Sequence, residues 1–303
     1  MVFCIAGKEA FSMPELPEVE TVRRGLEPVL VGQAFARVEQ RRPDLRVPLP
    51  KDFGKRLTGR TVEALDRRAK YLLVRLDNGE VLVVHLGMTG RFFIDGARMA
   101  LGEFDQDDAP MPKHEHVVFH LGDGTSVRFN DARRFGLMDL VHGDRLEQHA
   151  LFKGLGTEPL SKAFTPAWLA QRLRGKTTSI KAALLDQRLV VGLGNIYVSE
   201  ALHRARVSPL RKAGSLVTRS GKPTTETKAL VAAIRVVLEA AIKAGGSTLR
   251  DYAGADGRLG RFQHRFKVYD REGKRCAKKG CGGTVRRIVQ GGRSTFYCPT
   301  CQR

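Results

Sequence analysis

The feature that most constrains this chain is a group of four cysteines near its C-terminus. Four of the five cysteines lie within the last 28 residues and follow the pattern C-x4-C-x16-C-x2-C: Cys276, Cys281, Cys298 and Cys301. The short segment that carries them cannot bury a core of its own, so its stability has to come from a metal or a cross-link. Two closely spaced pairs of thiolates can occupy the four corners of a tetrahedron around one zinc ion.

The four-cysteine group therefore predicts one structural Zn²⁺ site. A closed set of four cysteines leaves no open position for water, so the metal would stabilise the fold without taking part in a reaction. In a reducing compartment, paired spacing of this kind indicates metal binding more often than disulfides, which are the alternative. The intervening segment RRIVQGGRSTFY predicts two strands joined by a turn at Gly291 and Gly292, with Arg293 at the tip.

The charge balance indicates a polyanionic partner. The 303 residues include 52 Lys and Arg against 32 Asp and Glu, a formal net charge of +20. Nucleic acid is therefore the first partner to consider. We find no basic amphipathic helix, no lipidation motif and no apolar run near the ~20 residues that span a bilayer, so we expect no membrane binding. Residues 1–12 lack the features of a secretory leader, and we expect a cytoplasmic protein.

The order of secondary-structure signals predicts an α+β protein with a sheet domain followed by a helical domain. The segment after Met13 has the pattern of an amphipathic helix, with Pro17 in its first turn and Gly32 at its end. From about Phe35 to Val141 the chain shows short β-rich runs. Beyond about residue 150, helical periodicity predominates in four stretches: 166–174, 180–187, 196–205 and 227–246.

Seven motifs, in the same order along the chain, resemble those of formamidopyrimidine-DNA glycosylases. They span Met13 to Cys301 and are MPELPEVETVRRGLEP, HLGMTGRF, DARRFG, LGTEPL, VVGLGNIYVSEAL, GGSTLRDY and GGRSTFYCPTC. The resemblance implies a bifunctional DNA glycosylase and abasic-site lyase that removes oxidised purines from duplex DNA and cuts the strand by β,δ-elimination. The related endonuclease VIII branch acts on oxidised pyrimidines and usually has Gly where Leu16 stands, so Leu16 favours the purine branch.

The resemblance also implies how the chain divides. It implies an N-terminal two-layer β-sandwich with an N-terminal helix, then a helix-two-turn-helix domain and a zinc hairpin, acting as a monomer with DNA across the cleft. We place the catalytic β-sandwich domain at 13–145, the hinge at 146–164, the helix-two-turn-helix domain with a lesion-capping loop at 165–266, and the zinc hairpin at 267–303. Residues 1–12 are expected to be a non-native extension.

By resemblance, the catalytic chemistry belongs to the residues that follow Met13. Pro14, as a free N-terminal secondary amine, would attack C1′ of the damaged nucleotide and form an iminium. A proline inside a peptide bond has no free amine, so we predict that translation starts at Met13 and that this methionine is removed. Glu15 matches the carboxylate that shuttles protons, and Glu18 is expected to order the same site. Without the resemblance, Pro14 would open a helix and both acids would compensate its dipole.

Other residues match contacts to DNA phosphates. Lys70 and Arg293 are expected to hold phosphates beside the lesion and complete the catalytic set. Lys181 matches a basic residue near the active site, and Asn195 is expected to bind a phosphate where a helix opens at Ile196. The alternatives are solvated lysines for Lys70 and Lys181 and a helix N-cap for Asn195.

Three residues match those that fill the space left when the damaged base leaves the stack. Met88 and Phe135 would replace the lost stacking, and Arg133 would bond to the orphaned cytosine. Outside the family, Met88 and Phe135 would be core residues. The segment from Asp251 to Phe266 corresponds to the loop that covers the extruded purine. A zinc protein that binds DNA phosphates without catalysis is the competing hypothesis from another functional class.

Overall fold

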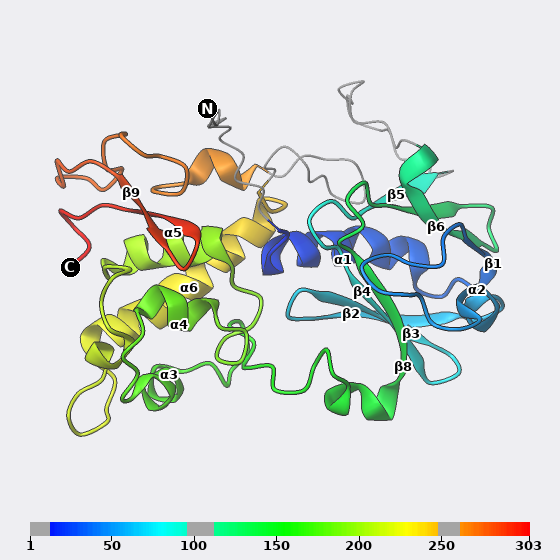
Figure 1. Cartoon of the computed structure of the whole chain (residues 1–303), viewed down its shortest axis with the longest axis horizontal. Coiled ribbons are helices and arrows are strands. Elements are labelled where there is room, and N and C mark those ends of the chain that lie inside the picture. Colours follow the sequence, from blue (N-terminus) through cyan, green and yellow to red (C-terminus); the bar gives the residue numbers. More distant parts are fainter. Residues whose placement is uncertain (1–12, 96–111, 248–260) are drawn as a thin grey trace, which may run out of the picture.

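The computed structural model describes residues 13–95, 112–247 and 261–303, which form two lobes (Figure 1). One lobe, on the right in Figure 1, contains the larger sheets, and the other contains helices α3 to α6 and the C-terminal hairpin. Helix α1 (Leu16–Leu30) lies between them and packs on β2 of the first lobe and on α6 of the second. The buried side of α1 carries Val19, Val22 and Leu26, as its pattern predicts.

The first lobe is a sandwich of two antiparallel four-stranded sheets, with strand orders β1-β6-β7-β5 and β2-β3-β4-β8. Side chains from both sheets, such as Phe119, Phe129, Leu72 and Leu82, share one buried core. The predicted two-layer β-sandwich is therefore confirmed. The elements are β1 (Phe35–Gln40), α2 (Phe53–Leu57), β2 (Val62–Arg68), β3 (Tyr71–Leu76), β4 (Glu80–His85), β5 (Arg91–Asp95), η2 (Pro112–His114), β6 (Glu115–Leu121), β7 (Ser126–Asn130) and β8 (Leu137–His142).

The second lobe is helical, and three of its helices begin at side-chain caps. Thr165, Ser179 and Thr224 accept the backbone N–H three residues later at the starts of α3, α4 and α6. The elements are α3 (Pro166–Leu173), α4 (Ile180–Leu185), α5 (Asn195–Ala205), η4 (Ala213–Leu216), α6 (Thr225–Lys243) and η5 (Phe262–Arg265). The short helix η3 (Gly143–Gln148) follows β8 and packs against the sheet lobe. All four helical stretches predicted from periodicity are present.

The C-terminal hairpin consists of β9 (Arg286–Gln290) and β10 (Arg293–Tyr297). Its strands pair from Arg293 to Gln290, so the turn contains only Gly291 and Gly292. Both glycines have positive φ, at 54° and 73°, which is the backbone that a two-residue hairpin turn requires. The predicted turn is confirmed, and β10 packs against α5.

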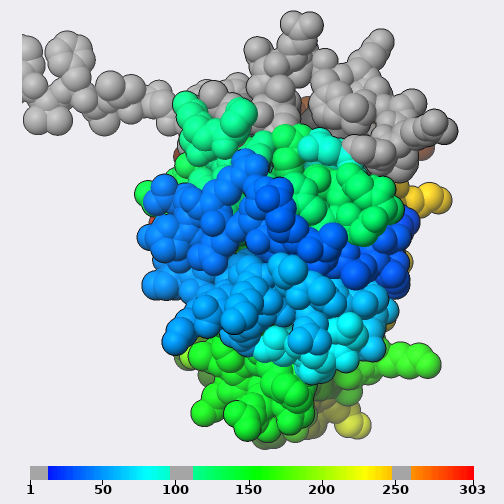
Figure 2. All heavy atoms as spheres, turned by 90° about the vertical axis from the view of Figure 1, so that its right-hand side faces the viewer, coloured from blue at the N-terminus to red at the C-terminus, as the bar shows by residue number. Residues whose placement is uncertain are grey.

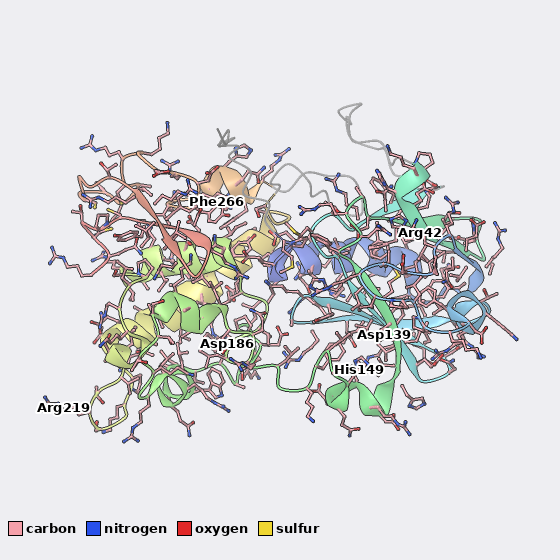
Figure 3. The ribbon with its side chains drawn as sticks, viewed as in Figure 1. Arg42, Asp139, His149, Asp186, Arg219 and Phe266 are labelled. Carbon is pink, nitrogen blue, oxygen red and sulfur yellow. The ribbon has the colours of Figure 1, made fainter. Side chains whose placement is uncertain are left out.

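Charged side chains cover both lobes, with Arg42 labelled on the sheet lobe and Arg219 at the far end of the helical lobe (Figure 3). Figure 2 views the sheet lobe end on, and the chain from α1 to β4, coloured blue to cyan, covers much of that face. Among the described residues, no helix has the length and apolar character needed to cross a membrane. Most of the predicted lesion-capping loop, up to residue 260, lies outside the described residues.

Candidate active site

The carboxylate of Glu15 lies at the N-terminus of α5, although Glu15 itself precedes α1. Its Oε2 accepts the Gly194 N–H at 2.7 Å and the Tyr197 N–H at 3.4 Å, and its Oε1 accepts the Ile196 N–H at 2.9 Å. The side chain is 2% exposed. Free N–H groups and the positive end of the helix dipole favour a carboxylate here. Pro14, the adjacent residue, is also buried.

Two glycines allow residues 15 and 16 to approach α5 this closely. A Cβ on Gly194 would lie 2.3 Å from the Glu15 Cδ, and one on Gly192 would lie 2.8 Å from the Leu16 Cβ. Gly192 also has a φ of +79° and accepts the Leu16 N–H at 2.9 Å. The glycines of the GLGN segment are therefore required by packing against the start of α1.

Glu18 joins three parts of the chain. Its Oε2 accepts the Glu15 N–H at 3.0 Å, which completes a capping box at the start of α1. Its Oε1 accepts the Ser247 N–H at 2.8 Å, the Ser247 hydroxyl at 2.9 Å and the Tyr197 hydroxyl. Glu18 thus fixes Glu15 relative to α5 and to the end of α6, a position suited to its predicted ordering role.

Burial sets the protonation of this pair of acids. It raises the pKa of Glu15 to about 7, with the nearby Lys70 ammonium opposing the change and Glu18 adding to it. Burial also raises the pKa of Glu18, against the hydrogen bonds from Tyr197 and Ser247. A carboxyl group with a pKa near 7 can both donate and accept a proton at neutral pH.

Three cations face the Glu15 site from three different elements. Lys70 occupies the two-residue turn between β2 and β3, and burial and Arg293 lower its pKa while Glu15 opposes them. Lys181 of α4 is 1% exposed, and burial, together with Arg293, lowers its pKa to about 8. Arg293 is exposed at the tip of the C-terminal hairpin. The electrostatic effects that these groups exert on one another indicate that the three predicted residues lie close together.

The C-terminal hairpin is also bonded to this site. Lys181 Nζ donates to the Ser294 carbonyl at 3.1 Å and to the Thr295 hydroxyl at 2.6 Å. Asn195 Nδ2 donates to the same Ser294 carbonyl at 2.9 Å. Asn195 is the first residue of α5 and Gly194 precedes it as the cap, so the helix begins one residue before the predicted Ile196.

Met88, Arg133 and Phe135 form a separate group on the loops that follow β4 and β7. Phe135 is 42% exposed, so it is not a core residue, and Met88 is half-buried. The Arg133 guanidinium lies over the Phe135 ring, 4.7 Å from its centroid. An exposed ring stacked with a guanidinium suits the predicted role of filling a gap in stacked DNA.

The four cysteines have the geometry of a metal site. Their Sγ atoms all lie within 4.8 Å of one another, with Cys276 and Cys301 3.8 Å apart and Cys281 and Cys298 3.6 Å apart. A tetrahedron with Zn–S bonds of about 2.3 Å has edges of about 3.8 Å, which matches these separations. All four are free thiols, so the disulfide alternative is excluded. His203 Nε2 lies 3.3 Å from the Cys276 Sγ, within reach of a thiolate ligand.

Comparison with known proteins agrees with this geometry. Family profiles match the chain over 13–138 (Formamidopyrimidine-DNA glycosylase N-terminal domain), 155–253 (Formamidopyrimidine-DNA glycosylase H2TH domain) and 273–303 (Zinc finger found in FPG and IleRS). The chain belongs to the formamidopyrimidine-DNA glycosylase family. The zinc-finger match and the four-thiol geometry together establish one structural zinc site.

Relatives from Methylobacterium and Azorhizobium caulinodans, both named formamidopyrimidine-DNA glycosylase, are 59% identical over 294 residues. The alignments cover 96% of this chain and 99% and 100% of those relatives. A Lactococcus lactis glycosylase variant bound to DNA containing Fapy-dG superposes with a TM-score of 0.82 at 34% identity, over 96% of this chain and 100% of that one. Another Lactococcus lactis complex contains abasic-site DNA, with a TM-score of 0.81, 34% identity and coverage of 95% and 99%.

Sequence reasoning missed two residues that support the glycosylase site. Glu158, from the segment between the lobes, accepts the Ala69 N–H at 2.6 Å and pairs with Arg67 and Arg68, so it holds the turn that carries Lys70. Glu200 of α5 accepts the backbone N–H groups of residues 267–269. The only sequence signal for Glu200 was an acid on the apolar side of a predicted helix.

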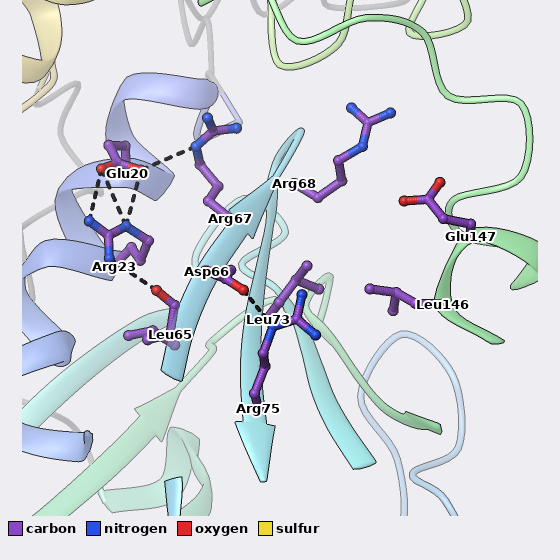
Figure 4. Close-up of a pocket in the computed structure, with 10 residues that line it drawn as sticks. All are labelled: Glu20, Arg23, Leu65, Asp66, Arg67, Arg68, Leu73, Arg75, Leu146 and Glu147. Carbon is purple, nitrogen blue, oxygen red and sulfur yellow. Dashed lines mark hydrogen bonds and ion pairs between the residues drawn. The ribbon is translucent and has the colours of Figure 1, made fainter. Parts of the chain in front are cut away.

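A cavity of about 320 Å³ lies behind the Lys70 turn, between α1, β2 and η3 (Figure 4). Its charged side chains pair within the protein: Glu20 bonds to Arg23 at 3.2 Å and to Arg67 at 3.3 Å. Asp66 pairs with Arg75 at 2.6 Å. None of the predicted site residues lines this cavity. Its ion pairs support the β2–β3 hairpin, which carries Lys70, from outside the site.

Gly194→Ala is expected to lower glycosylase activity by about 100-fold, because the new Cβ would displace the Glu15 carboxyl by an ångström or more. Single-turnover cleavage of a lesion-containing duplex measures this. The matched control is Gly122→Ala, since a Cβ there meets nothing within 4 Å. Equal activity of the two variants would contradict the close-packing account.

Removing the zinc is expected to unfold the C-terminal hairpin and abolish activity, since Arg293 and the partners of Lys181 lie on β10. Cys298→Ala should lose its zinc, measured by atomic emission, and become sensitive to trypsin at Arg286 and Arg287. Val289→Ala, which changes a side chain on the same hairpin that is 68% exposed, serves as the control. A zinc-free chain that keeps trypsin resistance and activity would show that the metal does not support the hairpin.

Proposed function

We propose that this chain excises oxidised purines, namely 8-oxoguanine and formamidopyrimidines, from duplex DNA and then cleaves the abasic strand by β,δ-elimination. It is a base-excision repair glycosylase by family. The observation that carries the proposal is the buried Glu15 carboxyl beside Pro14, with a pKa of about 7 and with Lys70, Lys181 and Arg293 facing it. This set supplies a proton shuttle and an anion-binding surface at one position.

Pro14 is the proposed nucleophile. As a free secondary amine it attacks C1′ of the damaged nucleotide, the bond from C1′ to the base breaks, and an iminium forms between proline and the opened sugar. Loss of the C2′ proton expels the 3′ phosphate, and a second elimination expels the 5′ phosphate. The reaction needs a free amine, so we expect the active form to begin at Pro14, with residues 1–13 absent.

Glu15 is the proposed proton shuttle for these steps. In its protonated form it donates to the sugar ring oxygen as the ring opens, and in its ionised form it can take a proton back. A pKa near 7 keeps both forms populated at neutral pH. Glu18 positions this carboxyl through the Glu15 N–H.

The cations and the exposed loop residues are proposed to hold the DNA. Lys70 and Arg293 bind phosphates beside the lesion, supported by Lys181 and Asn195. Met88, Arg133 and Phe135 enter the gap that the extruded base leaves. We place the protein in the cytoplasm, acting as a monomer on chromosomal DNA.

An endonuclease VIII-like preference for oxidised pyrimidines is the alternative. One Lactococcus lactis complex, at 34% identity and a TM-score of 0.81, contains DNA with an oxidised pyrimidine. Leu16 argues for the purine branch, because the endonuclease VIII branch usually has Gly at this position; the Leu16 side chain is fully buried against Gly192. Faster excision of thymine glycol than of 8-oxoguanine would favour the alternative.

Borohydride trapping on an 8-oxoguanine:cytosine duplex tests the proposal. A chain that begins at Pro14 is expected to form a covalent adduct that maps to Pro14 by peptide mass, because borohydride reduces the iminium. The same chain carrying residues 1–13 should form no adduct. The Glu15→Gln variant of the form that begins at Pro14 should form the adduct at a strongly reduced rate.

An adduct on a lysine, or one formed equally by the chain with residues 1–13, would show that Pro14 is not the nucleophile. DNA binding without any adduct from the Pro14 form would favour the non-catalytic hypothesis.

A further inference from the structure

A buried acid in the sheet lobe, Asp131, has no part in the chemistry proposed above. It is fully buried, and its Oδ2 accepts the Gly136 N–H at 2.7 Å. Its Oδ1 accepts the hydroxyl of Thr89. The Thr89 Oγ1 in turn accepts the Arg133 N–H at 3.1 Å. The Thr89 hydroxyl therefore joins the loop after β4 to the loop after β7 twice, once as a donor to Asp131 and once as an acceptor from Arg133.

The backbones of these two loops are also in close contact. A Cβ on Gly87 would lie 2.3 Å from the Phe135 carbonyl carbon, and one on Gly136 would lie 3.3 Å from the His85 carbonyl oxygen at the end of β4. The loop after β4 is closed by the Gly90 N–H, which donates to the Leu86 carbonyl at 2.8 Å. The two loops therefore pack as one unit, with glycines where side chains would separate them.

This unit carries the three residues proposed to enter the DNA. Met88 directly precedes Thr89, while Arg133 and Phe135 follow Asp131 in the other loop. Met88 is half-buried and the other two are exposed. The unit therefore presents these side chains to solvent, while the hydrogen bonds of Asp131 and Thr89 hold its base. We propose that Thr89 and Asp131 are positioning residues that fix Met88, Arg133 and Phe135 as one preformed wedge.

The inference rests on the proposed function and adds the hydrogen bonds that hold the three wedge residues in a fixed arrangement. A rigid wedge fills the gap in the duplex without ordering two loops at the moment of base extrusion. It also holds Arg133 where it can distinguish the base opposite the lesion. An abasic site has no base to extrude, so strand cleavage there depends much less on the wedge.

Substitutions at Thr89 separate this role from a general effect on folding. Thr89→Val keeps the shape but removes the hydroxyl, which leaves the Asp131 Oδ1 and the Arg133 N–H without that partner. Thr89→Ser keeps the hydroxyl. The control is Thr61→Val, because Thr61 bonds to Asp77 through its backbone N–H.

The experiment compares single-turnover rates on two duplexes, one with 8-oxoguanine opposite cytosine and one with a preformed abasic site, using the form that begins at Pro14. Thr89→Val is expected to lower 8-oxoguanine excision by about tenfold and to reduce the preference for cytosine over adenine opposite the lesion. Abasic-strand cleavage should stay within about threefold of the unmodified chain, and Thr89→Ser and Thr61→Val should behave like that chain in both assays.

A duplex that keeps cytosine opposite the lesion and has 2-aminopurine as the neighbour of the lesion in the same strand gives a second readout, because insertion of the wedge disturbs the stacking of that neighbour and raises its fluorescence. The rise should slow in Thr89→Val in proportion to excision. Equal excision by Thr89→Val and Thr89→Ser would overturn the inference, as would equal loss on both duplexes. Failure of the unmodified chain on both duplexes would instead refute the proposed function.

Discussion

The hydrogen bonds between the Glu15 carboxylate and the N-terminus of α5 are the contact on which the rest of the site depends. Glu15 belongs to the start of the sheet lobe and α5 to the helical lobe, so this contact fixes Pro14 between them. Helix α5 then extends the connection, because Glu200 holds residues 267–269 and His203 reaches Cys276. One helix thus links the proposed proton shuttle to the zinc-binding thiolates.

Two opposing effects determine what Glu15 can do chemically. The backbone N–H groups and Lys70 favour the carboxylate, while burial and the neighbouring Glu18 favour the neutral acid. Burial is the largest of these effects, so the pKa of Glu15 rises to about 7 despite the helix N-terminus. Burial also lowers the pKa of Lys70 and Lys181. Both cations are therefore partly desolvated, and a DNA phosphate can lie between them.

The sequence predicted the elements and the zinc ligands well, because their signals are local. Alternating strands, capped helices and cysteine spacing each depend on residues a few positions apart. The bonds from Glu15 to Ile196 and from Lys181 to Thr295 join residues more than 100 positions apart, so no periodicity reveals them. Phe135 would be assigned to the core by hydrophobicity alone. Helix α5 begins one residue before the predicted start, where the distant Glu15, the residue before α1, accepts the free N–H groups.

The most direct test of this account is the pKa of Glu15, measured by carboxyl ¹³C NMR titration of the zinc-loaded protein and assigned with Glu15→Gln. The account predicts a value near 7, so that Glu15 stays largely protonated at pH 6 and ionises as the pH rises through neutrality. A value at or below 4.5, the unperturbed level, would mean that the helix N-terminus and Lys70 outweigh burial. Glu15 would then be ionised throughout the neutral range and could not donate the proton that the proposed mechanism requires.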